Sequence, residues 1–179
     1  PKKVFICIDV ANGHMQQLYD FAKRAKEIHK DNLVLMVGNI ANPETYVEYS
    51  KIGVDFVRVG IGTGNVCTTS ANGGIHYPMG SLLEEINIIK DDNRRVFAKQ
   101  GWKFANIVAD GGFNNFDQIN KALALGADFV MLGKIFAKAE EACGEIIDFP
   151  NYDEEDTISK YREYYGMSTK RAQKELGKE

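Results

Sequence analysis

Short apolar runs alternate with helix-like stretches along most of this chain. Five runs are rich in β-branched and aromatic residues, and each ends in polar residues or glycine. Because the apolar residues are nearly continuous instead of alternating, they are typical of parallel strands buried on both faces of a sheet. The predicted strands are Val4–Ile8, Leu33–Val37, Phe56–Val59, Ile107–Ala109 and Phe129–Leu132.

Four helical stretches separate these runs, and Pro43 suits the first turn of one of them. A helix end, a glycine, a small apolar residue, an aspartate and a strand follow one another twice, at 52–55 and at 125–128. The pattern predicts an α/β fold in a single domain over residues 1–179. Five βα units cannot close an eight-stranded barrel, so an open doubly wound sheet and the C-terminal part of a barrel are both possible. The predicted helices are Gln16–His29, Pro43–Ile52, Ser81–Gln100 and Phe116–Leu125.

The pattern changes at residue 149 to a charged, loop-rich tail with a basic helical stretch at Ser168–Leu176. Composition narrows only the general class of protein. A hydrophobic content of 44% and a charged content of 26% are those of an ordinary globular domain. The net charge of −3 provides no basic surface for nucleic acid, and no apolar run is long enough to span a bilayer. We therefore expect neither nucleic acid nor a membrane as a partner.

Three cysteines occur at spacings that do not suit a metal site, which fits free thiols and a cytoplasmic protein. Cys67 follows the loop Gly60-Ile61-Gly62-Thr63-Gly64, whose glycines allow the backbone to approach an anion closely. A thiolate there would be a strong nucleophile, and loop amides can lower its pKa. The alternative is a small buried core residue. Cys7 and Cys143 are expected to be structural.

Glycine turns follow two successive predicted strands, at Gly111-Gly112 and at Gly133. Backbone N–H groups in such turns often hold a phosphate, whereas each glycine alone could simply punctuate a loop. Lys134 could add a charged contact to that phosphate or be a surface lysine. The carboxylate of Asp110 could bind ribose hydroxyls or cap a helix.

Six segments in this order resemble the IMP dehydrogenase and GMP reductase family, whose members are TIM barrels. The first and last segments, 9–13 (DVANG) and 165–168 (YGMS), resemble GMP reductases more than IMP dehydrogenases. The resemblance implies a parallel (β/α) TIM barrel, of which this chain holds about five C-terminal βα units of eight, with the tail leading into an active-site flap. The other segments are Gly38-Asn39, the cysteine loop with Tyr77-Pro78, Asp110-Gly111-Gly112 and Phe129–Gly133.

The resemblance also implies roles for single residues. Cys67 would attack carbon 2 of the purine and form a covalent thioimidate, and Thr69 would move a proton together with a glutamate on a flap beyond residue 179. Backbone carbonyls of Gly62, Gly64 and Cys67 would hold a monovalent cation such as K⁺. Asp9 and Asn39 would lie near the base and the cofactor. The substrate would contact Asn65, Asp110, Gly111, Gly112, Gly133, Lys134, Met167 and Ser168.

The implied reaction is the reductive deamination of GMP to IMP with NADPH, in a homo-oligomer that the resemblance suggests is a tetramer. Two alternatives stay open: NAD-dependent oxidation of IMP to XMP, and a half-barrel that binds purine nucleotides without catalysis. Thr63, Asn65 and Ser70 stand where typical GMP reductases have Pro, Ser and Arg, and Lys134 replaces a glycine. The segment 86–103 is also longer than is usual in the family.

Overall fold

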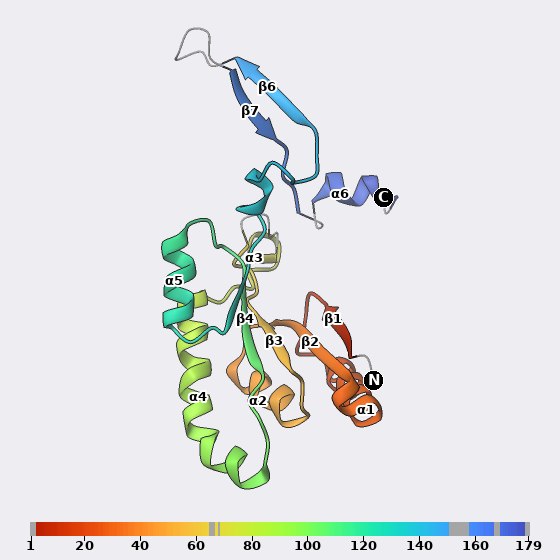
Figure 1. The fold of residues 1–179 in the computed structure, drawn as a ribbon, viewed down its shortest axis with the longest axis vertical. Coiled ribbons are helices and arrows are strands. Elements are labelled where there is room, and N and C mark those ends of the chain that lie inside the picture. Colours follow the sequence, from red (N-terminus) through yellow and green to blue (C-terminus); the bar gives the residue numbers. More distant parts are fainter. Residues whose placement is uncertain (1–2, 65–66, 68, 151–157, 167–168, 178–179) are drawn as a thin grey trace.

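A five-stranded parallel sheet forms the body of the molecule, with helices packed against it (Figure 1). The structure is a computed structural model that describes residues 3–64, 67, 69–150, 158–166 and 169–177. The five parallel strands predicted from the sequence are confirmed, with small differences at their ends. They are β1 (Val4–Asp9), β2 (Leu33–Ile40), β3 (Phe56–Val59), β4 (Asn106–Asp110) and β5 (Phe129–Met131).

The strands lie in the sheet in the same order as in the chain, β1-β2-β3-β4-β5. Parallel crossovers are almost always right-handed, so a sequential order places every connecting helix on the same face. A doubly wound sheet needs a point at which the order reverses. No such point exists among the described strands, so the doubly wound alternative is wrong for this sheet. The connecting helices are α1 (Gln16–His29), α2 (Pro43–Lys51), α4 (Met79–Gln100) and α5 (Phe116–Ala124).

Helix boundaries follow local capping chemistry. Asn42 caps α2 by accepting a hydrogen bond of 2.9 Å from the Thr45 amide, and Pro43 occupies the first turn. Gly101 ends α4 in the left-handed conformation, at φ 70°. Shorter elements connect the rest: η1 (Lys30–Asn32), α3 (Thr69–Gly73) and η2 (Phe136–Lys138).

The core lies between the sheet and the helices. One face of the central strands is fully covered, with Val37, Val57 and Ile107 all at 0% exposure. Aromatic side chains fill the layer above it, and the rings of Phe97 and Phe104 stack at 3.9 Å. The Tyr46 hydroxyl donates a 2.5 Å hydrogen bond to the Ala105 carbonyl, which satisfies a polar atom inside the core.

The opposite face of the sheet is only partly covered, so the expectation of strands buried on both faces is wrong for the described chain. On β1 the side chain of Phe5 is 75% exposed, and on β5 that of Phe129 is 52% exposed. Phe129 contacts only one ring of the sheet, Phe56, at 5.6 Å edge to face. Both strands are sheet edges, with a neighbour on one side only. The apolar composition of the runs therefore exceeds what this sheet buries.

The repeated aspartate before a strand has the same role at both places. Oδ2 of Asp55 accepts a 2.7 Å hydrogen bond from the Leu35 amide, and Oδ2 of Asp128 accepts one of 2.7 Å from the Ile107 amide. Each carboxylate thus ties the start of its strand to the neighbouring strand. The glycines of the repeat, Gly53 and Gly126, have φ of 79° and 98° and allow the turn out of the preceding helix.

The tail contains structure that the sequence did not predict. β6 (Ile146–Pro150) and β7 (Ile158–Arg162) pair as an antiparallel hairpin. Figure 1 shows this hairpin beyond α3 and η2, at the top of the view. The predicted basic helix is present as α6, but it is shorter, Lys170–Glu175. The expectation of a loop-rich tail is wrong at the hairpin.

Candidate active site

A cavity of about 570 Å³ lies at the carboxyl ends of the five strands. This is the position at which parallel α/β proteins place their ligands, and the volume is that of a small-molecule site. Asn65, Met167 and Ser168, predicted to contact substrate, lie outside the described residues. The other residues predicted from the sequence all line the cavity: Asp9, Asn39, Gly62, Gly64, Cys67, Thr69, Asp110, Gly111, Gly112, Gly133 and Lys134.

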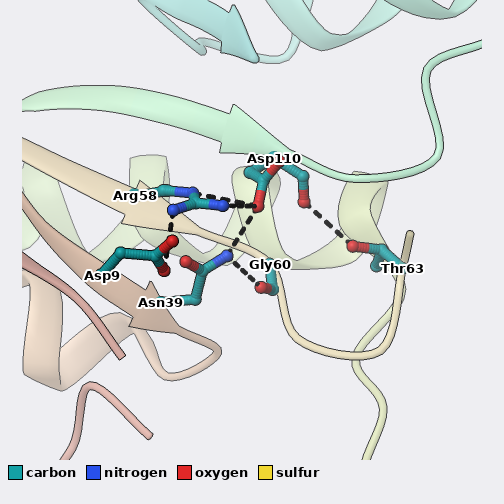
Figure 2. A network of polar contacts seen from close by, with 6 residues as sticks. All are labelled: Asp9, Asn39, Arg58, Gly60, Thr63 and Asp110. Carbon is teal, nitrogen blue, oxygen red and sulfur yellow. Dashed lines mark hydrogen bonds and ion pairs between the residues drawn. The ribbon is translucent and has the colours of Figure 1, made fainter. Parts of the chain in front are cut away.

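Arg58 lines the cavity and stands at the centre of a network of polar contacts (Figure 2). Its Nη1 lies 2.8 Å from Oδ1 of Asp9, and its Nε and Nη2 each lie 3.0 Å from Oδ2 of Asp110. Burial disfavours the charged guanidinium, but the two carboxylates outweigh burial and raise the pKa of Arg58. Arg58 therefore stays charged and joins the ends of β1, β3 and β4.

The backbone around Arg58 has room for this side chain because Gly38 lies beside it on β2. A Cβ at Gly38 would lie 2.5 Å from the Cβ of Arg58. Sequence reasoning missed Arg58, although a charged residue inside the apolar run of β3 was a usable signal. A strand interior seldom holds a charge unless a partner neutralises it.

Asn39 completes the network. Its side-chain amide donates 2.8 Å hydrogen bonds to the Gly60 carbonyl and to Oδ2 of Asp110. Asp110 thus receives donors from Asn39 and Arg58 on one carboxylate oxygen. The side chain of Asp9 is 64% exposed, so its carboxylate also faces the cavity solvent.

Two loops approach each other closely at this network, and glycine makes the approach possible. The Thr63 hydroxyl donates a 3.0 Å hydrogen bond to the Asp110 carbonyl. Gly111 and Gly112 have φ of 110° and 85°, and a Cβ at Gly112 would lie 2.7 Å from the Thr63 carbonyl oxygen. The Gly111-Gly112 turn and the cysteine loop are therefore packed backbone to backbone.

Cys67 lies on the wall of this cavity. Burial raises the pKa of its thiol, but hydrogen bonds from the Thr69 side chain and from backbone groups of Thr69, Gly62 and Ser70 outweigh burial and lower it. A thiol with these partners forms its thiolate more readily than an ordinary cysteine. Cys7 and Cys143 are exposed, and neither lines the cavity.

The three carbonyls that the resemblance assigns to a cation belong to the same loop. The Gly62 carbonyl lies 3.2 Å from Nδ1 of His76, and the Gly64 carbonyl accepts a 3.0 Å hydrogen bond from the Cys67 amide. Each carbonyl has a second lone pair, so these contacts are compatible with a cation. Among the described residues no cluster of His, Cys, Asp and Glu is suited to a metal ion.

The turn at Gly133 is closed by a residue of the tail. A Cβ at Gly133 would lie 2.6 Å from the hydroxyl oxygen of Tyr164, so the end of the tyrosine side chain would have to shift to make room for a larger residue. Tyr164 and Gly166 both line the cavity. The sequence did not single out Tyr164, because the contact joins two segments that are remote in the chain.

Known proteins resemble this chain over nearly its whole length. The family model described as "IMP dehydrogenase / GMP reductase domain" matches residues 3–179. The chain belongs to this family. It is 34% identical to "GMP reductase" of Caenorhabditis elegans and 36% identical to "GMP reductase 2" of Homo sapiens, each over 97% of this chain. It is 38% identical to "GMP reductase" of Aeromonas hydrophila over 94% of this chain.

This member of the IMP dehydrogenase and GMP reductase family spans less than half the length of those relatives, 43% to 45%. The matched part includes the five strand ends and the tail that closes the Gly133 turn. In the part of the chain that the structure describes, no helix has the length and apolar character needed to cross a membrane.

Proposed function

We propose that this chain is the part of a purine-nucleotide oxidoreductase that holds the nucleotide and supplies the nucleophile. The proposed reaction is reductive deamination of GMP to IMP. The observation that carries the proposal is the position of Cys67, a thiol of lowered pKa on the wall of a cavity large enough for a nucleotide. Relatives named GMP reductase support this reaction over the alternatives.

In the proposed reaction the Cys67 thiolate adds to carbon 2 of the guanine ring, and the amino group takes up the proton that the thiol had released and leaves as ammonia. The product of this step is a thioimidate that joins sulfur to carbon 2. When bound, NADPH supplies the hydride for carbon 2, after which the thiolate leaves and IMP is released. We assign the passing of a proton to the Thr69 hydroxyl, which is hydrogen-bonded to the thiol, although a hydroxyl is a weak base and needs a partner.

The other residues bind the nucleotide. Because Arg58 and Asn39 hold Oδ2 of Asp110, we assign the ribose contact to its other oxygen, Oδ1. The phosphate is assigned to backbone amides near Gly112 and Gly133, with Lys134 as a charged neighbour. The roles proposed for Asn65, Met167 and Ser168 rest on the resemblance alone.

Asp9 and Asn39 fit the cofactor side of the cavity. The exposed carboxylate of Asp9 can accept a hydrogen bond from an amide or hydroxyl group, and Asn39 is linked to it in turn through Asp110 and Arg58. K⁺ would bind to the carbonyls of Gly62, Gly64 and Cys67 and would stiffen the loop that carries the thiol.

We also propose that the five strands are a wall of a (β/α)₈ barrel. The sequential strand order, the exposed apolar residues on β1 and β5 and the greater length of the relatives support this. In a closed barrel both edges would be paired and the open face would be filled by side chains. A homo-oligomer is proposed on the resemblance alone.

Product analysis tests the reaction. Incubation of the full-length protein with GMP and NADPH should yield IMP, ammonia and oxidised cofactor in equal amounts. Conversion of IMP to XMP with NAD, and none of GMP, would instead identify the dehydrogenase reaction. A protein that binds GMP, protects Cys67 from alkylation and turns over neither nucleotide would be a binding module.

A further inference from the structure

A second cavity, of about 730 Å³, lies between η2 and the β6–β7 hairpin. Lys134 and Tyr164 line both this cavity and the candidate active site, so the two are adjacent. The residues that line the second cavity include four basic residues and one acidic residue, Glu140. The basic residues are Lys134, Lys138, Lys160 and Arg162.

The positive charge of this cavity is not neutralised by the described part of the chain. Within that part, Lys134, Lys138 and Lys160 form no ion pair. Asp148 is the cross-strand partner of Lys160 in the hairpin, but it forms no ion pair with it either. The three lysine side chains are exposed and can move toward a ligand.

The guanidinium of Arg162 is held in place and adds a fourth positive charge to those of the three exposed lysines. Its Nη1 donates a 2.7 Å hydrogen bond to the Ala139 carbonyl, and its Nη2 lies 3.4 Å from the Glu140 carbonyl. These acceptors are neutral, so they hold the guanidinium in place without cancelling its charge. Its Nε is buried and has no partner among the described residues. Arg162 therefore ties the hairpin to η2 and keeps a positive field in the cavity.

We propose that this cavity is an anion subsite that takes a phosphate group. Lysine binds phosphate as a compact charge, and Lys134 lies where the two cavities meet. The phosphate has two possible sources: the second phosphate of a nucleoside diphosphate in the active site, or a separate phosphate compound. The first source rests on the proposed function, whereas the subsite itself does not.

Inorganic pyrophosphate tests the subsite without a purine. Calorimetry with the full-length protein should show saturable binding of pyrophosphate. The double variant Lys138→Gln/Lys160→Gln should weaken that binding at least about tenfold, because two charge-assisted contacts are lost. A charge-matched control, Lys51→Gln/Lys121→Gln on α2 and α5, should stay within about twofold of wild type. Absence of pyrophosphate binding, or equal weakening in both double variants, would overturn the proposal.

The relative affinities for GDP and GMP identify the source of the phosphate. Tighter binding of GDP than of GMP, lost in the Lys138→Gln/Lys160→Gln variant, would assign the subsite to the second phosphate of the nucleotide. Equal binding of GDP and GMP beside tight pyrophosphate binding would assign it to a separate phosphate compound. If pyrophosphate binds and neither nucleotide does, the subsite stands and the proposed purine-nucleotide function fails.

Discussion

Two nitrogens of Arg58, Nε and Nη2, each lie 3.0 Å from the same oxygen of Asp110. The remaining nitrogen lies 2.8 Å from Asp9, so one planar cation spans three strand ends. A guanidinium can do this because its donors diverge in a fixed plane. A charge network therefore joins three strand ends in the candidate active site.

The first prediction concerns this network. Arg58→Lys keeps the charge but offers one nitrogen in place of three, so it cannot hold Asp9 and Asp110 together. We expect GMP affinity to fall about tenfold and the free energy of unfolding to fall by about 2 kcal/mol. Calorimetry and urea unfolding measure the two effects. Arg94→Lys, in an exposed pair with Asp91 on α4, is the control and should change stability by less than about 0.5 kcal/mol.

The second prediction concerns the nucleophile. Cys67→Ala should lower turnover of GMP at least about a thousandfold and change the dissociation constant of GMP less than about threefold. The reason is that the sulfur bonds to the purine only along the reaction path. Steady-state kinetics and calorimetry on the full-length protein separate the two quantities. Cys7→Ala and Cys143→Ala, which change thiols that do not line the cavity, should keep most activity. Turnover near wild type in the Cys67 variant would rule out the covalent mechanism.

The third prediction concerns pH. Because the pKa of Cys67 is lowered, its thiolate forms at a lower pH than that of an ordinary cysteine, and its alkylation rate should rise at a lower pH than that of free cysteine in solution. Thr69→Val removes a hydrogen bond to the thiolate and should shift the alkylation profile toward higher pH. Thr69→Ser keeps a hydroxyl and should restore the wild-type profile. Identical profiles for Cys67 in all three proteins would show that Thr69 does not tune the thiol.

The fourth prediction concerns the loop contact at Gly112. Gly112→Ala places a Cβ 2.7 Å from the Thr63 carbonyl at φ 85°, so the two loops must separate. We expect GMP affinity to fall at least about tenfold, as the phosphate turn moves. Gly101→Ala, also at positive φ but with no atom within 4 Å, isolates the backbone strain and should leave GMP affinity unchanged. Equal GMP affinities of the two variants would show that Gly112 is not part of the phosphate site.

Much of the sheet could be predicted from the sequence, because its strands are short apolar runs and its turns carry glycine. The aspartate in each repeat marked the start of a strand correctly. Its contact with the neighbouring strand, such as that of Asp55 with Leu35, depends on which strands are adjacent and so has no local signal. The β6–β7 hairpin was missed because charged residues interrupt its strands and obscure the alternation.

The candidate site was predictable as a set of strand ends but not as a network. Polar residues and glycines after parallel strands must gather at one edge, and they do. Which groups bond to one another depends on side-chain reach across β1, β3 and β4. Arg58 lies within a strand, not after one, and it was overlooked for that reason.

The aspartates at 55 and 128 sit at the amino ends of their strands, away from the cavity. These two carboxylates therefore help to hold strand register from outside the cavity. Loops at the opposite end can change in sequence without touching these two contacts. New specificity in this lineage can arise by exchanging loops alone, and a protein engineer can graft loops onto the same frame.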